Sequence, residues 1–291
     1  MMTQNSLDST IRPSQDDLIC HNEESLGTLP PEIEYEIFIL AFCNNKREAT
    51  NLLRVAKRVA EWLIPMLYEV VVLAHGMHRQ SYPPMESLQL HGRHVRHLLV
   101  SSFPSPTDGH ALLSTCPNVS DLVFWSGVQN TAQILNLPIT RLYFENNDFI
   151  GAELWGLPKT PQIEQWCSHI THLVLGSDIN YSSSVALDDL KVLTLFPSLT
   201  HFMTFSWNKP PVIRRLLVCC LHLQVFVWLW GRGEAEDPTH VVEGEDECPV
   251  DDPRIVTLNG TYVRDWMRSF QGEDDFWILA EREIQRKRCN I

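Results

Sequence analysis

The sequence predicts an α/β protein in which a short helical hairpin precedes an irregular solenoid of strand and helix units that share a parallel sheet. Three observations favour this class. Apolar residues recur at helical spacing between residues 29 and 65, a six-residue apolar motif recurs along the rest of the chain, and most segments between its copies have helical character. With 291 residues, 44% of them apolar, the chain is long enough to bury a core without disulfides or metals.

The hairpin follows a polar tail. Residues 1–26 are predicted to be disordered, because Ser, Asp, Asn and Gln predominate and few apolar residues offset the entropy of ordering. A first helix is predicted to begin at Leu29-Pro30-Pro31-Glu32, and its apolar residues have helical spacing: Ile33, Ile37, Leu40 and Ala41. A second helical run is expected to end at Pro65, and its apolar residues are Leu52, Val55, Val59 and Trp62 or Leu63. Residues 27–73 are therefore assigned to a helical domain.

The remainder, residues 74–291, is predicted to consist of repeats that start just before it. The motif apolar, x, x, apolar, x, apolar has a partial eighth copy at Ile255 and seven earlier copies, of which the sixth is broken at its last place by Thr204. The seven begin at Leu67, Val95, Val119, Ile139, Ile170, Leu199 and Leu223. Chance would produce about 25 such windows at this composition, so the motif alone proves nothing. Its free fifth place, however, is apolar in all seven copies: Val71, Leu99, Val123, Tyr143, Val174, Met203 and Val227. Continuous apolar strands that alternate with helices indicate a buried parallel sheet with right-handed crossovers.

Three segments of this region are assigned separately. Residues 146–161 are predicted to be an irregular insertion, and residues 234–252 an acidic loop. A closing helix is predicted over residues 274–288, because acids at its start and basic residues at its end match the helix dipole. We expect it to cap the end of the solenoid with an apolar face made of Phe276, Trp277, Ala280 and Ile284.

The net charge of −13 comes from two segments. Residues 1–28 contribute −4 and residues 234–252 contribute −9, so the rest of the chain is neutral overall. Because a surface that follows phosphates needs a basic excess, nucleic-acid binding is not predicted. Neither a secretory signal nor a bilayer-length apolar stretch is present in the sequence. We therefore expect an intracellular protein of the cytoplasm or nucleus, without a membrane partner.

The sequence predicts no enzyme and no cofactor. It contains no glycine-rich phosphate loop, no Gly-x-Ser-x-Gly motif and no His-Glu-x-x-His motif. His91, His94 and His97 are spaced by three, which would align metal ligands only on a helix. Residues 95–100 are predicted to form a strand, so no metal site is predicted.

Polar and aromatic side chains share one face of the predicted sheet. Places three, five and seven of the motif alternate with the core places four and six, so they lie on the concave face where solenoids bind partners. The candidate residues for binding a protein substrate are His97, Asp121, Trp125, Arg141, Tyr143, His172, His201 and Phe205. The alternative is that the acidic loop or the insertion packs over this face and hides it, and the sequence leaves both open.

The helical domain resembles an F-box. The resemblance covers residues 29–73 and rests on Leu29-Pro30-Pro31-Glu32-Ile33, Ile37, the Leu-Leu-Arg-Val-Ala-Lys-Arg run at residues 52–58, Trp62 and Leu67-Tyr68. One departure is Val59, where the family usually has an aromatic residue. The repeat spacing is close to that of leucine-rich repeats but ragged. With the closing Asp-Asp-Phe-Trp helix, the chain is similar to the F-box-like proteins that are abundant in mushroom-forming fungi.

The resemblance implies a substrate-recognition subunit of a cullin-RING ubiquitin ligase, which performs no chemistry itself. Its F-box would bind the adaptor subunit of the ligase, and its repeats would hold a protein substrate near the ubiquitin-charged enzyme. The adaptor-binding residues that the resemblance implies are Leu29, Pro30, Ile33, Ile37, Leu52 and Val55. The alternative is a non-catalytic interaction scaffold with a degenerate F-box.

Overall fold

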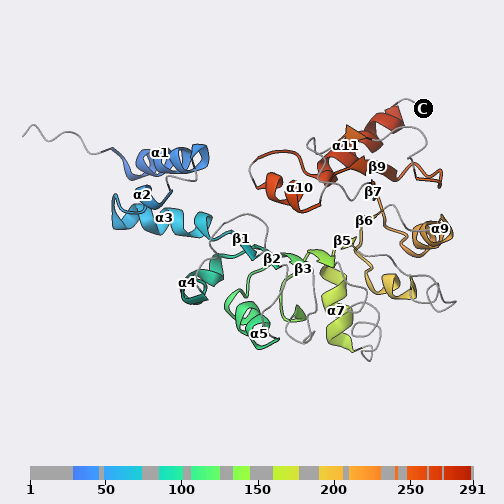
Figure 1. Ribbon diagram of the computed structural model, residues 1–291, viewed down its shortest axis with the longest axis horizontal. Helices are drawn as coiled ribbons and strands as arrows, with labels where there is room; N and C mark the ends of the chain where they lie inside the picture. Colours follow the sequence, from blue (N-terminus) through green and yellow to red (C-terminus); the bar gives the residue numbers. More distant parts are fainter. Residues whose placement is uncertain are drawn as a thin grey trace, which may run out of the picture.

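The computed structural model describes most of the chain between residues 29 and 289. Its ranges are 29–45, 49–73, 85–100, 106–124, 134–144, 160–176, 190–205, 210–230, 240–241, 248–260, 262–270 and 272–289. The predicted tail, Trp125 and most of the insertion and of the acidic loop lie outside them. The described residues form a mixed α/β fold with one open, mainly parallel sheet (Figure 1), which confirms the predicted class at that level.

The first three helices form a unit at one end of the sheet, the N-terminal helical unit (Figure 1). These helices are α1 (Pro31–Asn44), α2 (Ala49–Leu52) and α3 (Lys57–Leu67). They enclose a small separate core of Phe42, Ala49, Val59 and Leu63. Arg58 of α3 donates to Glu34 of α1 at 2.6 Å, and the rings of Tyr35 and Trp62 meet edge to face at 5.5 Å. The unit therefore has its own internal contacts, independent of the sheet.

The expectation that Pro65 ends the second helix is wrong, because α3 continues to Leu67. Proline removes one hydrogen bond, the one that its N–H would have donated to the carbonyl of Glu61. Glu61 is exposed, so water can satisfy that carbonyl. The next turn still closes, since the N–H of Tyr68 donates to the carbonyl of Ile64 at 3.1 Å. A proline this close to a helix end is thus tolerated.

One sheet of nine strands makes up the centre of the described region, in the order β1-β2-β3-β4-β5-β6-β7-β9-β8. The strands are β1 (Val70–Leu73), β2 (His97–Val100), β3 (Asp121–Phe124), β4 (Arg141–Phe144), β5 (His172–Leu175), β6 (His201–Phe205), β7 (Val225–Trp230), β8 (His240–Val241) and β9 (Ile255–Asn259). Only β8 is antiparallel within this sheet; the other eight strands run parallel. They lie at the motif copies, which confirms the predicted parallel sheet. The register agrees for the second to seventh copies, whereas Val71 pairs with Leu98 and Ile255 pairs with Phe226, so the first copy is displaced by one place and the eighth by three.

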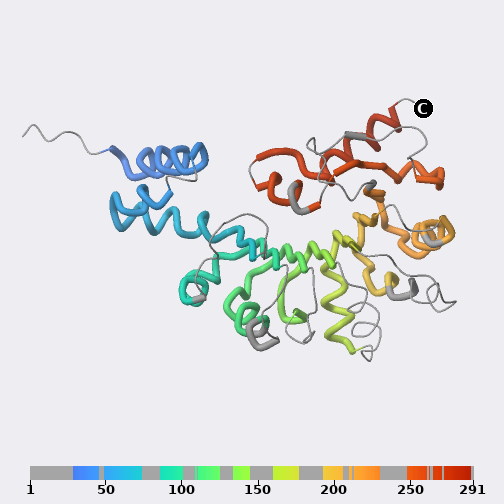
Figure 2. The backbone as a smooth tube through the Cα atoms, in the orientation of Figure 1, coloured from blue at the N-terminus to red at the C-terminus, as the bar shows by residue number. Residues whose placement is uncertain are grey.

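Short helical segments connect the strands along one face of the sheet (Figure 2). They are α4 (Met85–His91), η2 (Gly92–His94), α5 (Pro106–Thr115), α7 (Pro161–His169), η4 (Leu190–Leu195) and α9 (Pro210–Cys219). In β2 to β7 the strand residues at motif places four and six point to this side, where Leu98, Leu122, Phe202 and Phe226 join a continuous buried cluster that we call the outer core. In β1 it is Val71 that joins this cluster. Burial of this apolar area is the main favourable term that holds each connection to the sheet.

The opposite face is covered by α10 (Tyr262–Ser269) and α11 (Phe276–Cys289), as Figure 1 shows. The buried cluster on this side, the inner core, joins place-five residues such as Leu99 and Val174 to Tyr262 and Trp266 of α10. The predicted apolar face of the closing helix is confirmed as buried: Phe276, Trp277, Ala280 and Ile284. The helix packs against β7 and β9, the last two parallel strands of the sheet, and it does so on their inner face. The helix α10 was not predicted.

The backbone of Gly92 approaches α5 closely, which leads to a stability prediction. A Cβ at residue 92 would lie 2.3 Å from the carbonyl oxygen of Thr115 and 3.2 Å from the Sγ of Cys116. Because a backbone carbonyl cannot rotate away, Gly92→Ala is expected to lower the free energy of unfolding by about 1–3 kcal/mol, measured by urea denaturation. Gln89→Ala, at an exposed site of α4, is the control. Equal stability of the two variants would contradict the close approach.

Candidate functional site

The sheet brings five of the candidate substrate-binding residues together in one row, which we call the polar row. Strand pairing places them side by side at the starts of β2 to β6, in the order His97, Asp121, Arg141, His172 and His201. Tyr143 lies two residues further along β4, and Phe205 lies at the end of β6. The motif predicted this register, because the same place recurs on neighbouring strands.

Hydroxyl residues just before the strands align the first residues of neighbouring strands with one another. Ser120, Thr140, Thr171 and Thr200 occupy the place before β3 to β6. The hydroxyls of Ser120 and Thr140 donate to the carbonyls of Arg96 and Ser120 at 3.4 and 3.2 Å. Those of Thr171 and Thr200 lie 3.2 Å from the carbonyl of the corresponding residue one strand earlier and 2.8 Å from the Nδ1 of the histidine that follows. The backbone N–H of each residue donates to the same carbonyl at 2.8–3.0 Å. This ladder of paired donors holds successive strand starts in register. In the sequence it is visible only as a Ser or Thr before four of the five members of the row, since His97 follows Arg96.

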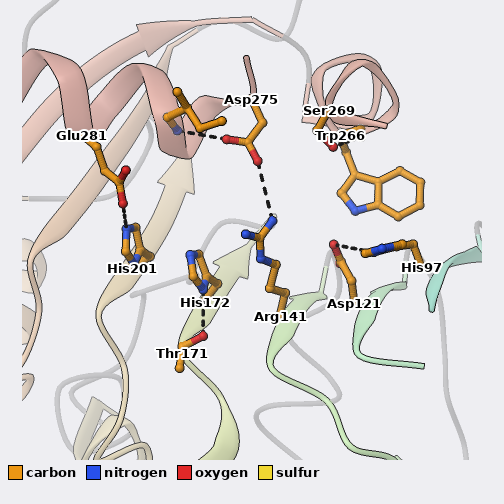
Figure 3. Close-up of polar contacts among 11 residues, drawn as sticks. His97, Asp121, Arg141, Thr171, His172, His201, Trp266, Ser269, Asp275 and Glu281 are labelled. Atoms are coloured by element: carbon orange, nitrogen blue, oxygen red, sulfur yellow. Dashed lines mark hydrogen bonds and ion pairs between the residues drawn. The ribbon is translucent and has the colours of Figure 1, made fainter. Parts of the chain in front are cut away.

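His172 and His201 form a stacked pair at the centre of the interface with α11 (Figure 3). Their rings are 4.1 Å apart and inclined by 11°. The Nδ1 of each lies 2.8 Å from the hydroxyl of the threonine before it, and the Nε2 of His201 lies 3.0 Å from Oε1 of Glu281. Trp277 meets both rings edge to face, at 5.2 and 5.5 Å. The pair is thus enclosed by α11.

Arg141 and Asp275 connect the row to the start of α11 (Figure 3). Oδ2 of Asp275 lies 3.6 Å from Nη1 of Arg141, while its Oδ1 accepts a hydrogen bond from the N–H of Ile278 at 2.9 Å. The same carboxylate therefore caps the helix and attracts the guanidinium of the row. At the other end of the row, His97 lies 3.5 Å from Asp121 and packs against the ring of Phe270 at 4.3 Å.

The inner face is not an open concave surface. Asp121, Tyr143 and His201 are buried. His97, Arg141, His172 and Phe205 are half-buried, and Trp125 lies outside the described residues. Among the described residues the cover consists of α10 and α11, while most of the insertion and of the acidic loop, the two segments that the sequence suggested for this role, lie outside them. The inner face is covered because its place-five residues are apolar, and an open face would leave them in contact with water.

Burial keeps the stacked pair neutral. It lowers the pKa of His172 to about 2, and the neighbouring His201 and Arg141 act in the same direction. Burial also lowers the pKa of His201, opposed by its hydrogen bond to Glu281. Both rings are therefore uncharged at neutral pH. Stacked rings and a capping carboxylate are the features of a packed interface between the sheet and α11.

The residues expected to bind an adaptor are found at the surface. Leu29, Ile33, Ile37 and Val55 are 49–60% exposed, Pro30 is exposed and Leu52 is half-buried. Leu40, which was not included in that set, is also exposed. Because Ile33, Ile37 and Leu40 are spaced by four and three residues, they lie on one side of α1. We call Leu29, Ile33, Ile37 and Leu40 the apolar strip.

Two further sequence expectations concern metals and membranes. The part of the chain that the structure describes holds no group of three or more His, Cys, Asp or Glu residues that could bind a metal ion. The ring of His91 packs against Tyr68 at 4.7 Å and lies 6.5 Å from that of His94. In the same described part, no helix combines the length and the hydropathy needed to cross a bilayer.

No protein-family model matches this sequence, and no curated protein matches it either. The exposed apolar strip and the covered polar row are therefore the features on which a functional assignment depends.

Proposed function

We propose that this chain is an F-box-type substrate-recognition subunit of a cullin-RING ubiquitin ligase. In this proposal the N-terminal helical unit binds the adaptor subunit, and the sheet with its connecting helices is an irregular leucine-rich-repeat-like receptor for a protein substrate. The observation that supports it best is the apolar strip, which is exposed although its unit already has a core. Apolar side chains gathered on one exposed helix face are typical of a protein-protein contact.

The internal contacts of the helical unit favour the same reading. Phe38 and Phe42 face inward, and the Glu34–Arg58 pair joins α1 to α3, so the exposed side of α1 is not needed to fold the unit. Val59, where the F-box pattern usually has an aromatic residue, is fully buried in this core. Its smaller size therefore affects the packing between the helices rather than the chemistry of the exposed strip.

Burial excludes most of the inner face of the sheet as a surface that could hold a substrate. Asp121, Tyr143 and His201 are enclosed and are not part of an accessible surface. Within the row, the side chain of Arg141 stays 41% exposed and is the candidate contact that an incoming chain could reach. Such a receptor would act by proximity, because holding the substrate raises the concentration of its lysines near the ubiquitin-charged enzyme.

An Ile37→Glu substitution tests adaptor binding. Ile37 lies at the centre of the apolar strip and is half exposed, so a carboxylate there can remain hydrated in the free protein. Enclosing that carboxylate in an apolar interface is unfavourable, and we expect affinity for a purified adaptor subunit to fall about tenfold or more. Titration calorimetry or co-purification of the full-length chain with the adaptor measures it.

Leu221→Glu is the matched control, since Leu221 is an 83% exposed leucine beyond α9 and outside the helical unit. It should bind the adaptor like the unchanged chain. Unchanged binding by Ile37→Glu would show that the strip is not the contact surface. If the unchanged chain itself does not bind the adaptor, the alternative is favoured, namely a non-catalytic interaction scaffold with a degenerate F-box.

A further inference from the structure

Protonation of either ring in the stacked histidine pair is unfavourable in the closed structure. The two rings lie 4.1 Å apart, and the edge of Trp277 closes the side that faces α11. Both Nδ1 atoms are already within 2.8 Å of a threonine hydroxyl. A charge on either ring would therefore be stacked against its neighbour and largely shielded from water, which is unfavourable.

The charged groups around the pair affect its two members differently. Arg141, on the adjacent strand β4, repels a proton on His172. Glu281 and Asp275 of α11 attract a proton to His201, and Arg141 opposes them. From α10, Tyr262 lies on this face, and its pKa is raised well above its ordinary value by burial and then by Asp121. The same helix carries the buried Asp265, which lies 3.8 Å from Nη1 of Arg268. His172 is thus the member that α11 keeps neutral without a compensating carboxylate.

The direction of the pH effect follows from proton binding. With α11 in place the pKa of His172 is about 2, whereas a histidine in water has its ordinary pKa of about 6.5. A state in which α11 has left the sheet therefore binds a proton that the closed state does not. Its population rises as pH falls below about 6.5, and it is insensitive to pH well above that value. One such histidine increases the opening constant about tenfold between pH 7.5 and 5.5.

We propose that α11 is an acid-released cover, which leaves the inner face of the sheet, with α10, when the His172–His201 pair takes up a proton. The cover and the polar row lie apart from the apolar strip, so this inference does not depend on adaptor binding. Release would expose the inner core and the polar row, the face that the motif places on the concave side.

Hydrogen exchange of the full chain tests the proposal. After correction for the intrinsic pH dependence of exchange, amides in α11 should exchange about tenfold faster at pH 5.5 than at pH 7.5, while amides in α3 and α7, which do not contact the cover, should change little. The proposal is overturned if α11 shows no such change. It is equally overturned if α3 and α7 lose as much protection as α11, because acid would then act on the whole fold.

Two substitutions shift the response in opposite directions. We call the ratio of the α11 exchange rates at pH 5.5 and pH 7.5 the acid response. His172→Gln removes the titrating ring and should reduce the acid response to about threefold or less. Glu281→Gln, at a half-exposed site, removes the carboxylate that supports a proton on closed His201, so the acid response should exceed that of the unchanged chain. His222→Gln, at an exposed site, is the control and should respond normally. A full response in His172→Gln, or a weaker one in Glu281→Gln, would refute the mechanism.

Discussion

Trp277→Ala is expected to lower the free energy of unfolding by about 3–5 kcal/mol. The indole is buried between α11 and the sheet, where it contacts both rings of the stacked pair. Its loss removes a large apolar area from the inner core and leaves a cavity beside His172 and His201. The same cavity admits water to the histidines, so their protonation becomes easier. Urea denaturation at pH 7.5 measures the change in stability.

Ile278→Ala is the control for this prediction. Ile278 follows Trp277 on α11, but its side chain is 39% exposed, so its truncation should cost less than about 1 kcal/mol. A loss of similar size in both variants would mean that Trp277 does not hold α11 to the sheet. A large loss confined to Trp277→Ala would identify the ring as the main anchor of the cover.

The parallel sheet could be predicted because its signal is repeated. A single apolar window is common by chance, but Val123, Tyr143 and Val174 recur at the same free place of successive copies. In the structure these residues are paired across β3, β4 and β5. Repetition of one place on neighbouring strands fixes the register, since the same residue of each unit meets the next unit.

The cover could not be assigned from the same pattern. Apolar place-five residues already indicate that the second face is buried, but they do not identify the segment that buries it. Tyr262, Trp266 and Phe270 are spaced by four, which is the helical signal of α10 and the clue that could have located it. That run is short and includes Arg264, Asp265 and Arg268, so its helical signal is weak in the sequence.

In the helical unit, the spacing of apolar residues likewise does not identify which side of α1 packs inward. Helical spacing shows that Ile33 and Ile37 share one side of α1, and equally that Phe38 and Phe42 share another. It does not tell which side packs against α3. The structure assigns the inward side to the aromatic residues and leaves the aliphatic strip exposed. Burial of Phe42 against Ala49, Val59 and Leu63 goes with this choice, and such tertiary contacts are not encoded in the spacing.

Phe226→Ala is the second substitution for which we expect a loss of about 3–5 kcal/mol. Phe226 is fully buried in the outer core, and its ring lies 5.6 Å from that of Phe202 on the neighbouring strand. Truncation leaves a cavity between β7 and the connecting helices, which close packing on both sides prevents from collapsing. The exposed Gln224, just before the same strand, supplies the control Gln224→Ala, which should stay within about 0.5 kcal/mol of the unchanged chain.

Phe226→Ala and Trp277→Ala should differ in how they change the pH dependence of hydrogen exchange in α11. Phe226 and Trp277 belong to different clusters, on opposite faces of the sheet. Phe226→Ala should therefore lower stability without altering the ratio of α11 exchange rates between pH 5.5 and 7.5, whereas Trp277→Ala should reduce that ratio because its histidines are already hydrated. If Phe226→Ala changed the ratio as much as Trp277→Ala does, the pH response would belong to the fold as a whole and not to the contact between α11 and the histidine pair.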